Sequence, residues 1–143
     1  MSTFVWTTIW LTVGSIGGLI FVAYARDHGL RGQLRIYALG LVVAAAIYVV
    51  LAALGGSVRW VGIEVLGVLV FAGIAALGLG MTPLWLAFGW AVHAVWDAGL
   101  HLFRQSGVVG TWYPIACIPF DLIVAVAIVL YAVRADHDSL HRL

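Results

Sequence analysis

Five long apolar runs, separated by short polar or turn-rich breaks, dominate the chain. The runs cover residues 4–25, 34–54, 60–80, 83–103 and 112–133. Each matches the length of about 20 residues that an α-helix needs to cross the hydrocarbon core of a bilayer. The pattern predicts an all-α fold over residues 1–143, a single integral membrane bundle of five transmembrane helices.

The break between the third and fourth runs is the shortest. Only Gly78, Gly80, Thr82 and Pro83 interrupt the apolar sequence there, so a tight hairpin is expected. A bundle of four spans with one re-entrant segment is the alternative architecture.

The composition excludes several classes of protein. Hydrophobic residues make up 64% of the chain and charged residues 9%, against about 25% charged residues in soluble domains. A net charge of +1 without any lysine excludes a nucleic-acid partner. The single cysteine, Cys117, cannot form a disulfide within the chain. The first run lacks a basic region before it, so it is expected to remain as an uncleaved anchor rather than a signal peptide.

The arginines predict an orientation in the cell membrane. With five spans, one side carries two arginines, Arg59 and Arg104. The other side carries five: Arg26, Arg31, Arg35, Arg134 and Arg142. Because positive residues are retained in the cytoplasm, we expect the N-terminus outside and the C-terminal tail in the cytoplasm.

Gly14 and Gly18 in the first run lie one helical turn apart and offer a face for close packing with another helix. Two interpretations are open: packing against a helix of the same chain, or a homodimer formed through this face.

Ionisable residues inside the apolar runs are the strongest sign of function. His93, Asp97 and His101 follow at intervals of four residues in the fourth run, which places them on one face of an α-helix. Glu64 and Asp121 lie in the neighbouring runs. Since an ionisable side chain in a membrane costs several kcal/mol unless it is paired, ligated or hydrated, these residues mark a candidate site.

Their depths in the membrane predict a shared site. A rise of 1.5 Å per residue places Asp97, Asp121 and His93 about 9 to 15 Å below the outer edge, with Glu64 and His101 nearer the mouth. One metal ion would be held by His93, Asp97 and Asp121, with Glu64 or His101 as an outer partner or base. A dinuclear site would use all five, with Asp97 bridging. Imidazole and carboxylate donors suit Zn, Fe or Mn.

A purely structural interpretation of these residues is also open. His93 and Asp97 would form a pair within one helix, and Asp121 would be satisfied by Tyr113 or by a tryptophan indole. Proton relays use the same residue types.

A substrate pocket is expected next to the polar site. Leu86 and Trp90 lie on the same helix face as His93, and Tyr113 and Cys117 lie on the last helix before Asp121. Such a pocket between helices would suit an apolar small molecule. Ordinary interior packing is the alternative.

Two motifs carry a family resemblance over the last two runs. His93, Trp96 and Asp97 form a His-x-x-Trp-Asp pattern, which is followed by Trp-Tyr-Pro-x-x-Cys-x-x-x-Asp from residue 112 to residue 121. The chain resembles a family of small bacterial polytopic membrane proteins of unknown function, and has Leu102 where that family has a second histidine. The resemblance implies the location of the site and no activity.

These observations favour a metal-dependent intramembrane enzyme that acts on a lipid-soluble substrate by hydrolysis or hydration. Glu64, Asp97 and Asp121 are the candidate catalytic residues, and His93, Asp97, His101 and Asp121 the candidate metal ligands. A proton-coupled transporter or small-molecule carrier that uses the same carboxylates is the first alternative. A haem-binding membrane protein, with His93 or His101 as axial ligand, is the second.

Overall fold

A computed structural model describes residues 2–55, 57–103 and 110–140, and these residues form helices joined by short turns. The elements are α1 (Thr3–Arg26), α2 (Gly29–Leu54), α3 (Val58–Gly80), α4 (Leu84–Trp96), the π-helix η1 (Asp97–Phe103) and α5 (Trp112–Leu140). The predicted all-α bundle is confirmed.

Four of these helices are long and apolar enough to cross a membrane: α1, α2, α3 and the Trp112–Arg134 part of α5. The α4 helix has only 13 residues, but η1 continues it without a break. Together α4 and η1 form one helical segment over residues 84–103, which coincides with most of the predicted fourth run. The described part of the chain therefore contains five helical segments: four that could each span a membrane by length and apolarity, and the composite segment of α4 and η1.

The connection between α1 and α2 is shorter than the polar break between the first two apolar runs, residues 26–33. Gly29 begins α2 with a φ of 65°, a left-handed conformation that glycine adopts without steric cost. The helix therefore starts five residues before the predicted run and includes Arg31 and Arg35 in its first turns. Arginine is a good helix former, so it lowers the hydropathy of this segment without ending the helix.

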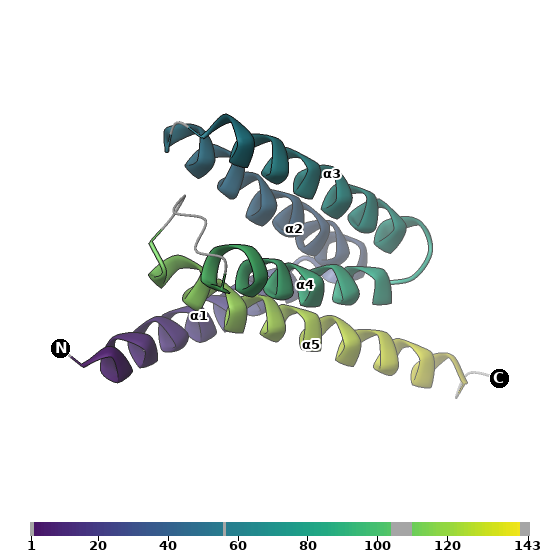
Figure 1. The fold of residues 1–143 in the computed structure, drawn as a ribbon. Coiled ribbons are helices and arrows are strands. Elements are labelled where there is room, and N and C mark those ends of the chain that lie inside the picture. Colours follow the sequence, from purple (N-terminus) through teal and green to yellow (C-terminus); the bar gives the residue numbers. More distant parts are fainter. Residues whose placement is uncertain (1, 56, 104–109, 141–143) are drawn as a thin grey trace.

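Figure 1 shows two pairs of helices with α4 between them. The α2 and α3 helices lie side by side, α1 lies along α5, and α4 contacts α2, α3 and α5. The start of α1 and the end of α5 lie at opposite ends of the bundle (Figure 1).

The contact of α1 with α5 depends on small residues. A Cβ atom on Gly14 would overlap the carbonyl oxygen of Ala116, and one on Gly18 would lie 3.1 Å from the Cα of Phe120. Both glycines are buried. The Gly14 and Gly18 face is thus covered by α5 of the same chain, the first of the two interpretations of this pattern.

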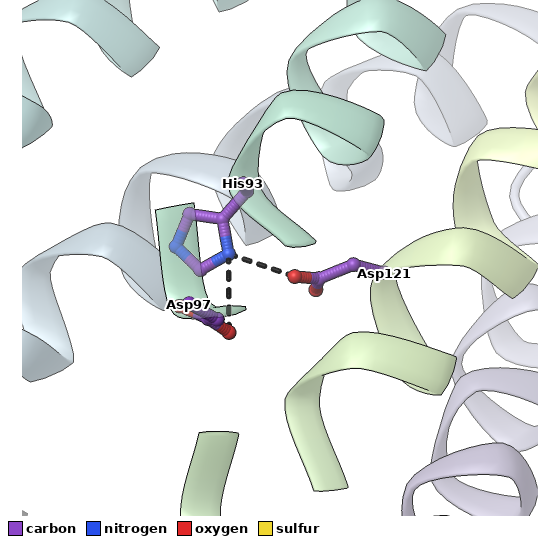
Figure 2. Close-up of side chains that lie close together, drawn as sticks. All are labelled: His93, Asp97 and Asp121. Carbon is purple, nitrogen blue, oxygen red and sulfur yellow. Dashed lines mark hydrogen bonds and ion pairs between the residues drawn. The ribbon is translucent and has the colours of Figure 1, made fainter. Parts of the chain in front are cut away.

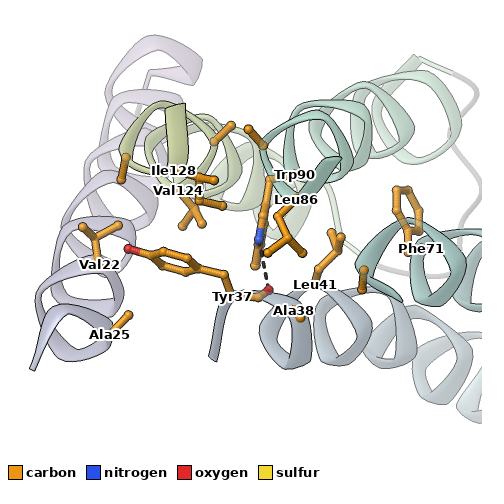
Figure 3. Packing of buried hydrophobic residues seen from close by; sticks show 14 of the residues in the cluster. Val22, Ala25, Tyr37, Ala38, Leu41, Phe71, Leu86, Trp90, Val124 and Ile128 are labelled. Carbon is orange, nitrogen blue, oxygen red and sulfur yellow. Dashed lines mark hydrogen bonds between the residues drawn. The ribbon is translucent and has the colours of Figure 1, made fainter. Parts of the chain in front are cut away.

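Apolar and polar interiors occupy different halves of the bundle. The hydrophobic core surrounds Tyr37, Leu86 and Trp90, toward the end where α1 ends and α4 begins (Figure 3). The Trp90 indole donates a hydrogen bond to the carbonyl oxygen of Tyr37 at 3.2 Å. Except for Gln33, the buried polar and charged side chains of the described residues lie toward the other end: Glu64, His93, Asp97, His101 and Asp121.

Candidate metal centre

Three side chains from two helical segments converge between α4 and α5. His93 lies near the end of α4, Asp97 is the next residue on the same face, and Asp121 comes from α5. The Nδ1 atom of His93 lies 2.8 Å from Oδ2 of Asp121 and 3.8 Å from Oδ2 of Asp97. Figure 2 shows both carboxyl groups directed toward this nitrogen. One ligand atom from each of the three residues lies within 4.8 Å of the others.

Burying these three ionisable side chains has a high cost in free energy. The exposed fractions of His93, Asp97 and Asp121 are 1%, 0% and 1%. Among the described residues, neither oxygen of Asp97 nor Nε2 of His93 has a partner in hydrogen-bond geometry. A buried carboxylate without such partners costs several kcal/mol. The arrangement is therefore that of a site which would be stabilised by a bound cation.

The second polar group lies between η1 and α3. Oε1 of Glu64 lies 3.2 Å from Nε2 of His101, and its Oε2 accepts a hydrogen bond from the Trp96 indole at 3.2 Å. Glu64 and His101 are both almost completely buried. This pair is separate from the group of three around His93.

The π-helix contributes to the position of His101 outside the metal group. The spacing of four residues from Asp97 to His101 closes a turn in an α-helix, but η1 begins at Asp97, and a π-helix has more residues per turn. Position 101 is therefore rotated relative to the α-helical expectation, and the imidazole meets Glu64 of α3. The three ligands predicted for one metal ion, His93, Asp97 and Asp121, converge in the structure. His101, which was also a candidate ligand, lies outside this group beside Glu64.

Tyr48 of α2 is a site residue that sequence reasoning missed. Its ring stacks on the His101 imidazole with 4.0 Å between centroids and an interplanar angle of 10°. Its hydroxyl lies beside Asp97 and Cys117, although it is not in hydrogen-bond geometry with a described partner. Tyr48 connects the two polar groups. A signal existed: after Arg35 and Tyr37 at its start, Tyr48 is the only residue of the predicted 34–54 run with a polar side-chain group.

The structure also places the residues of the expected pocket. A cavity of about 410 Å³ reaches from α1 and α2 to α5, and Trp90, Tyr113, Cys117 and Asp121 contribute to its wall. Leu86 does not line this cavity; it lies in the hydrophobic core, where its side chain packs beside Gly78.

The geometry separates two interpretations of Asp121. The structural alternative satisfied this carboxyl group through Tyr113 or an indole. In the structure its hydrogen bond is instead to His93 of α4, which has Asp97 on its other side. Asp121 thus belongs to the group that could hold a metal ion.

No family model, curated protein or solved structure matches this chain. The resemblance carried by the two motifs therefore stays an expectation.

Proposed function

We propose that this protein is a metal-dependent intramembrane enzyme that acts on a lipid-soluble substrate by hydrolysis or hydration. The observation that carries the proposal is the convergence of the buried side chains of His93, Asp97 and Asp121, whose ligand atoms lie within 4.8 Å of one another. Three protein ligands leave a coordination position for substrate or water, as in catalytic rather than structural metal sites.

The donor set fits a divalent cation. Two carboxyl groups and one imidazole provide the hard oxygen and borderline nitrogen donors that Zn, Fe and Mn accept. The Nδ1 atom of His93 and Oδ2 of Asp121 are 2.8 Å apart and form a hydrogen bond. Metal ligands have to be deprotonated. A cation would therefore take the place of the proton in this hydrogen bond, and its positive charge would balance the two buried carboxylates.

A divalent cation at this position would supply Lewis-acid polarisation of a substrate and activation of water near neutral pH. The chain's own residues would provide the proton transfers. Glu64 is the candidate general base or acid, because it lies close enough to His93 and Asp97 to interact with them electrostatically. Trp96 and His101 hold its two oxygens, so the carboxyl group is oriented before a substrate arrives.

Metal analysis of detergent-purified protein tests the proposal. Wild-type protein should carry stoichiometric Zn, Fe or Mn after purification without added metal. His93→Gln should lose it, because the substitution removes the imidazole between the two carboxylates. His28→Gln is the matched control, since His28 is exposed at the junction of α1 and α2 and should not affect metal content. Folded wild-type protein without metal, and unable to take it up, would contradict the proposal.

A proton-coupled carrier is the second candidate. It is favoured by the continuity of the polar interior, in which Tyr48 joins the Glu64 and His101 pair to Asp97. A relay of this kind would need no metal ion. Proton uptake into vesicles that contain the metal-free protein would support the carrier, and its loss in Glu64→Gln would assign the relay.

A further inference from the structure

We infer that the cavity between α1, α2 and α5 holds a single long hydrocarbon chain that enters sideways from the bilayer. The class of substrate is then an acyl or isoprenoid lipid. The assignment of this lipid as the substrate rests on the proposed function; the binding of the chain does not.

The mouth of the cavity opens toward lipid. Val13 of α1 and Val43 and Ile47 of α2 line it and are 49%, 49% and 37% exposed. All three lie inside helices that are long and apolar enough to span a membrane. The surroundings of this mouth are therefore hydrocarbon tails rather than water, and the molecules that reach it first are the chains of lipids.

Small residues of both helices line the opening. Gly14 and Gly17 on α1 and Gly40 and Ala44 on α2 line the cavity. Small residues on two neighbouring helices usually allow close packing. Here α1 packs mainly against α5, so Gly14 lies against Ala116 of α5, and Gly40 lies against the Phe21 ring. Gly17 has more room, because a Cβ atom there would meet only the Phe120 ring, at 3.4 Å.

The size and the wall of the cavity suit one chain. Its volume of about 410 Å³ lies within the range of about 300–1,000 Å³ typical of small-molecule sites. At about 30 Å³ for a group the size of a water molecule, it accommodates roughly a dozen methylene groups.

Three residues with polar groups contribute to the mostly apolar wall of the cavity. Tyr113, Cys117 and Asp121 lie along the α5 wall, and Asp121 is hydrogen-bonded to His93 of the candidate metal centre. A chain in the cavity would therefore bring the polar group of its lipid beside Asp121. This geometry connects an apolar entrance to the residues that would carry out the reaction.

Photocrosslinking in reconstituted bilayers tests the inference. The probe is palmitic acid with a diazirine in the middle of its chain, incorporated into vesicles with the wild-type protein, irradiated and mapped by peptide mass spectrometry. Labels are expected on the inner lining residues Ala116, Cys117 and Phe120. Gly17→Leu should reduce labelling of these residues roughly tenfold, because it fills the cavity: a Cβ atom at Gly17 lies 3.4 Å from the Phe120 ring and meets no backbone.

Two further variants keep the test decisive. Gly73→Leu adds the same side chain to α3, where a Cβ atom meets nothing within 4 Å, and should leave the labelling of the cavity unchanged. Ala44→Phe fills the cavity from α2 if Gly17→Leu does not fold. Labels confined to outer residues, or full labelling of the cavity in both filled variants, would overturn the inference.

The remaining outcomes separate this inference from the proposed function. Labelling of the cavity in protein without metal would support the chain site even though the enzyme proposal fails. Stoichiometric metal without labels inside the cavity would overturn the chain site alone. A Val13→Cys variant that forms a disulfide-linked dimer and excludes the probe would show that a second copy fills the mouth, which also overturns it.

Discussion

Asp97 gives the sharpest test of the metal centre. If Asp97 is a metal ligand, Asp97→Asn should stabilise the metal-free protein; if Asp97 makes a structural contact, the same substitution should destabilise it. The side chain is completely buried, and neither oxygen has a described hydrogen-bond partner. Asp97→Asn keeps the shape of the side chain and removes its charge. In metal-free protein the substitution should therefore be stabilising.

The magnitude follows from the burial. An uncompensated buried carboxylate costs several kcal/mol, and an unsatisfied buried amide about 1–3 kcal/mol. The difference should stabilise the metal-free variant by about 1–2 kcal/mol, or roughly 3–6 °C in Tm. Metal at 100 times its Kd should stabilise wild-type protein by about 2.7 kcal/mol, and should stabilise the variant much less because a ligand is lost. The order of the two melting temperatures should then reverse between chelator and metal.

Thermal unfolding of the detergent-purified proteins, followed by intrinsic tryptophan fluorescence with EDTA or with added Zn, measures both effects. Asp27→Asn is the control, since Asp27 is exposed at the end of α1 and should behave as wild type in both conditions. A full metal-induced rise in Asp97→Asn would refute the assignment of Asp97 as a ligand. A lower Tm than wild type in EDTA would instead show that Asp97 makes a stabilising contact without metal.

Three other outcomes are expected. Glu64→Gln should keep the metal content of wild type, because Glu64 pairs with His101 outside the group of three; loss of metal in an intact fold, measured by elemental analysis, would contradict this separation. Gly14→Leu should lower the free energy of unfolding by about 1–3 kcal/mol or more through overpacking against α5, whereas Gly73→Leu should be nearly neutral in the same denaturation assay. A cysteine introduced at Ser57 in a cysteine-free background should react with an impermeant maleimide added outside the cell; labelling only after permeabilisation would reverse the predicted orientation.

The location of the polar site could be predicted because depth in a membrane is nearly a function of sequence position. The constant rise of a helix assigns His93, Asp97 and Asp121 to similar depths, and the high energy of buried charge requires such residues to have partners. These two facts hold for any arrangement of the helices. The five helical segments follow in the same way, from the length and apolarity of the runs.

The partners themselves were decided by the tertiary structure. The rotation of each helix about its axis depends on packing, so sequence could not show that Tyr48 of α2 would stack on His101. His101 lies in the π-helix that begins at Asp97 and pairs with Glu64, and propensities of single residues carry no signal for this change in helical hydrogen bonding. The cavity beside Asp121 likewise depends on packing, because its wall combines residues of α1, α2 and α5, and α1 contacts α5 closely at Gly14. Sequence thus determined which residues share a depth, and packing determined which of them meet.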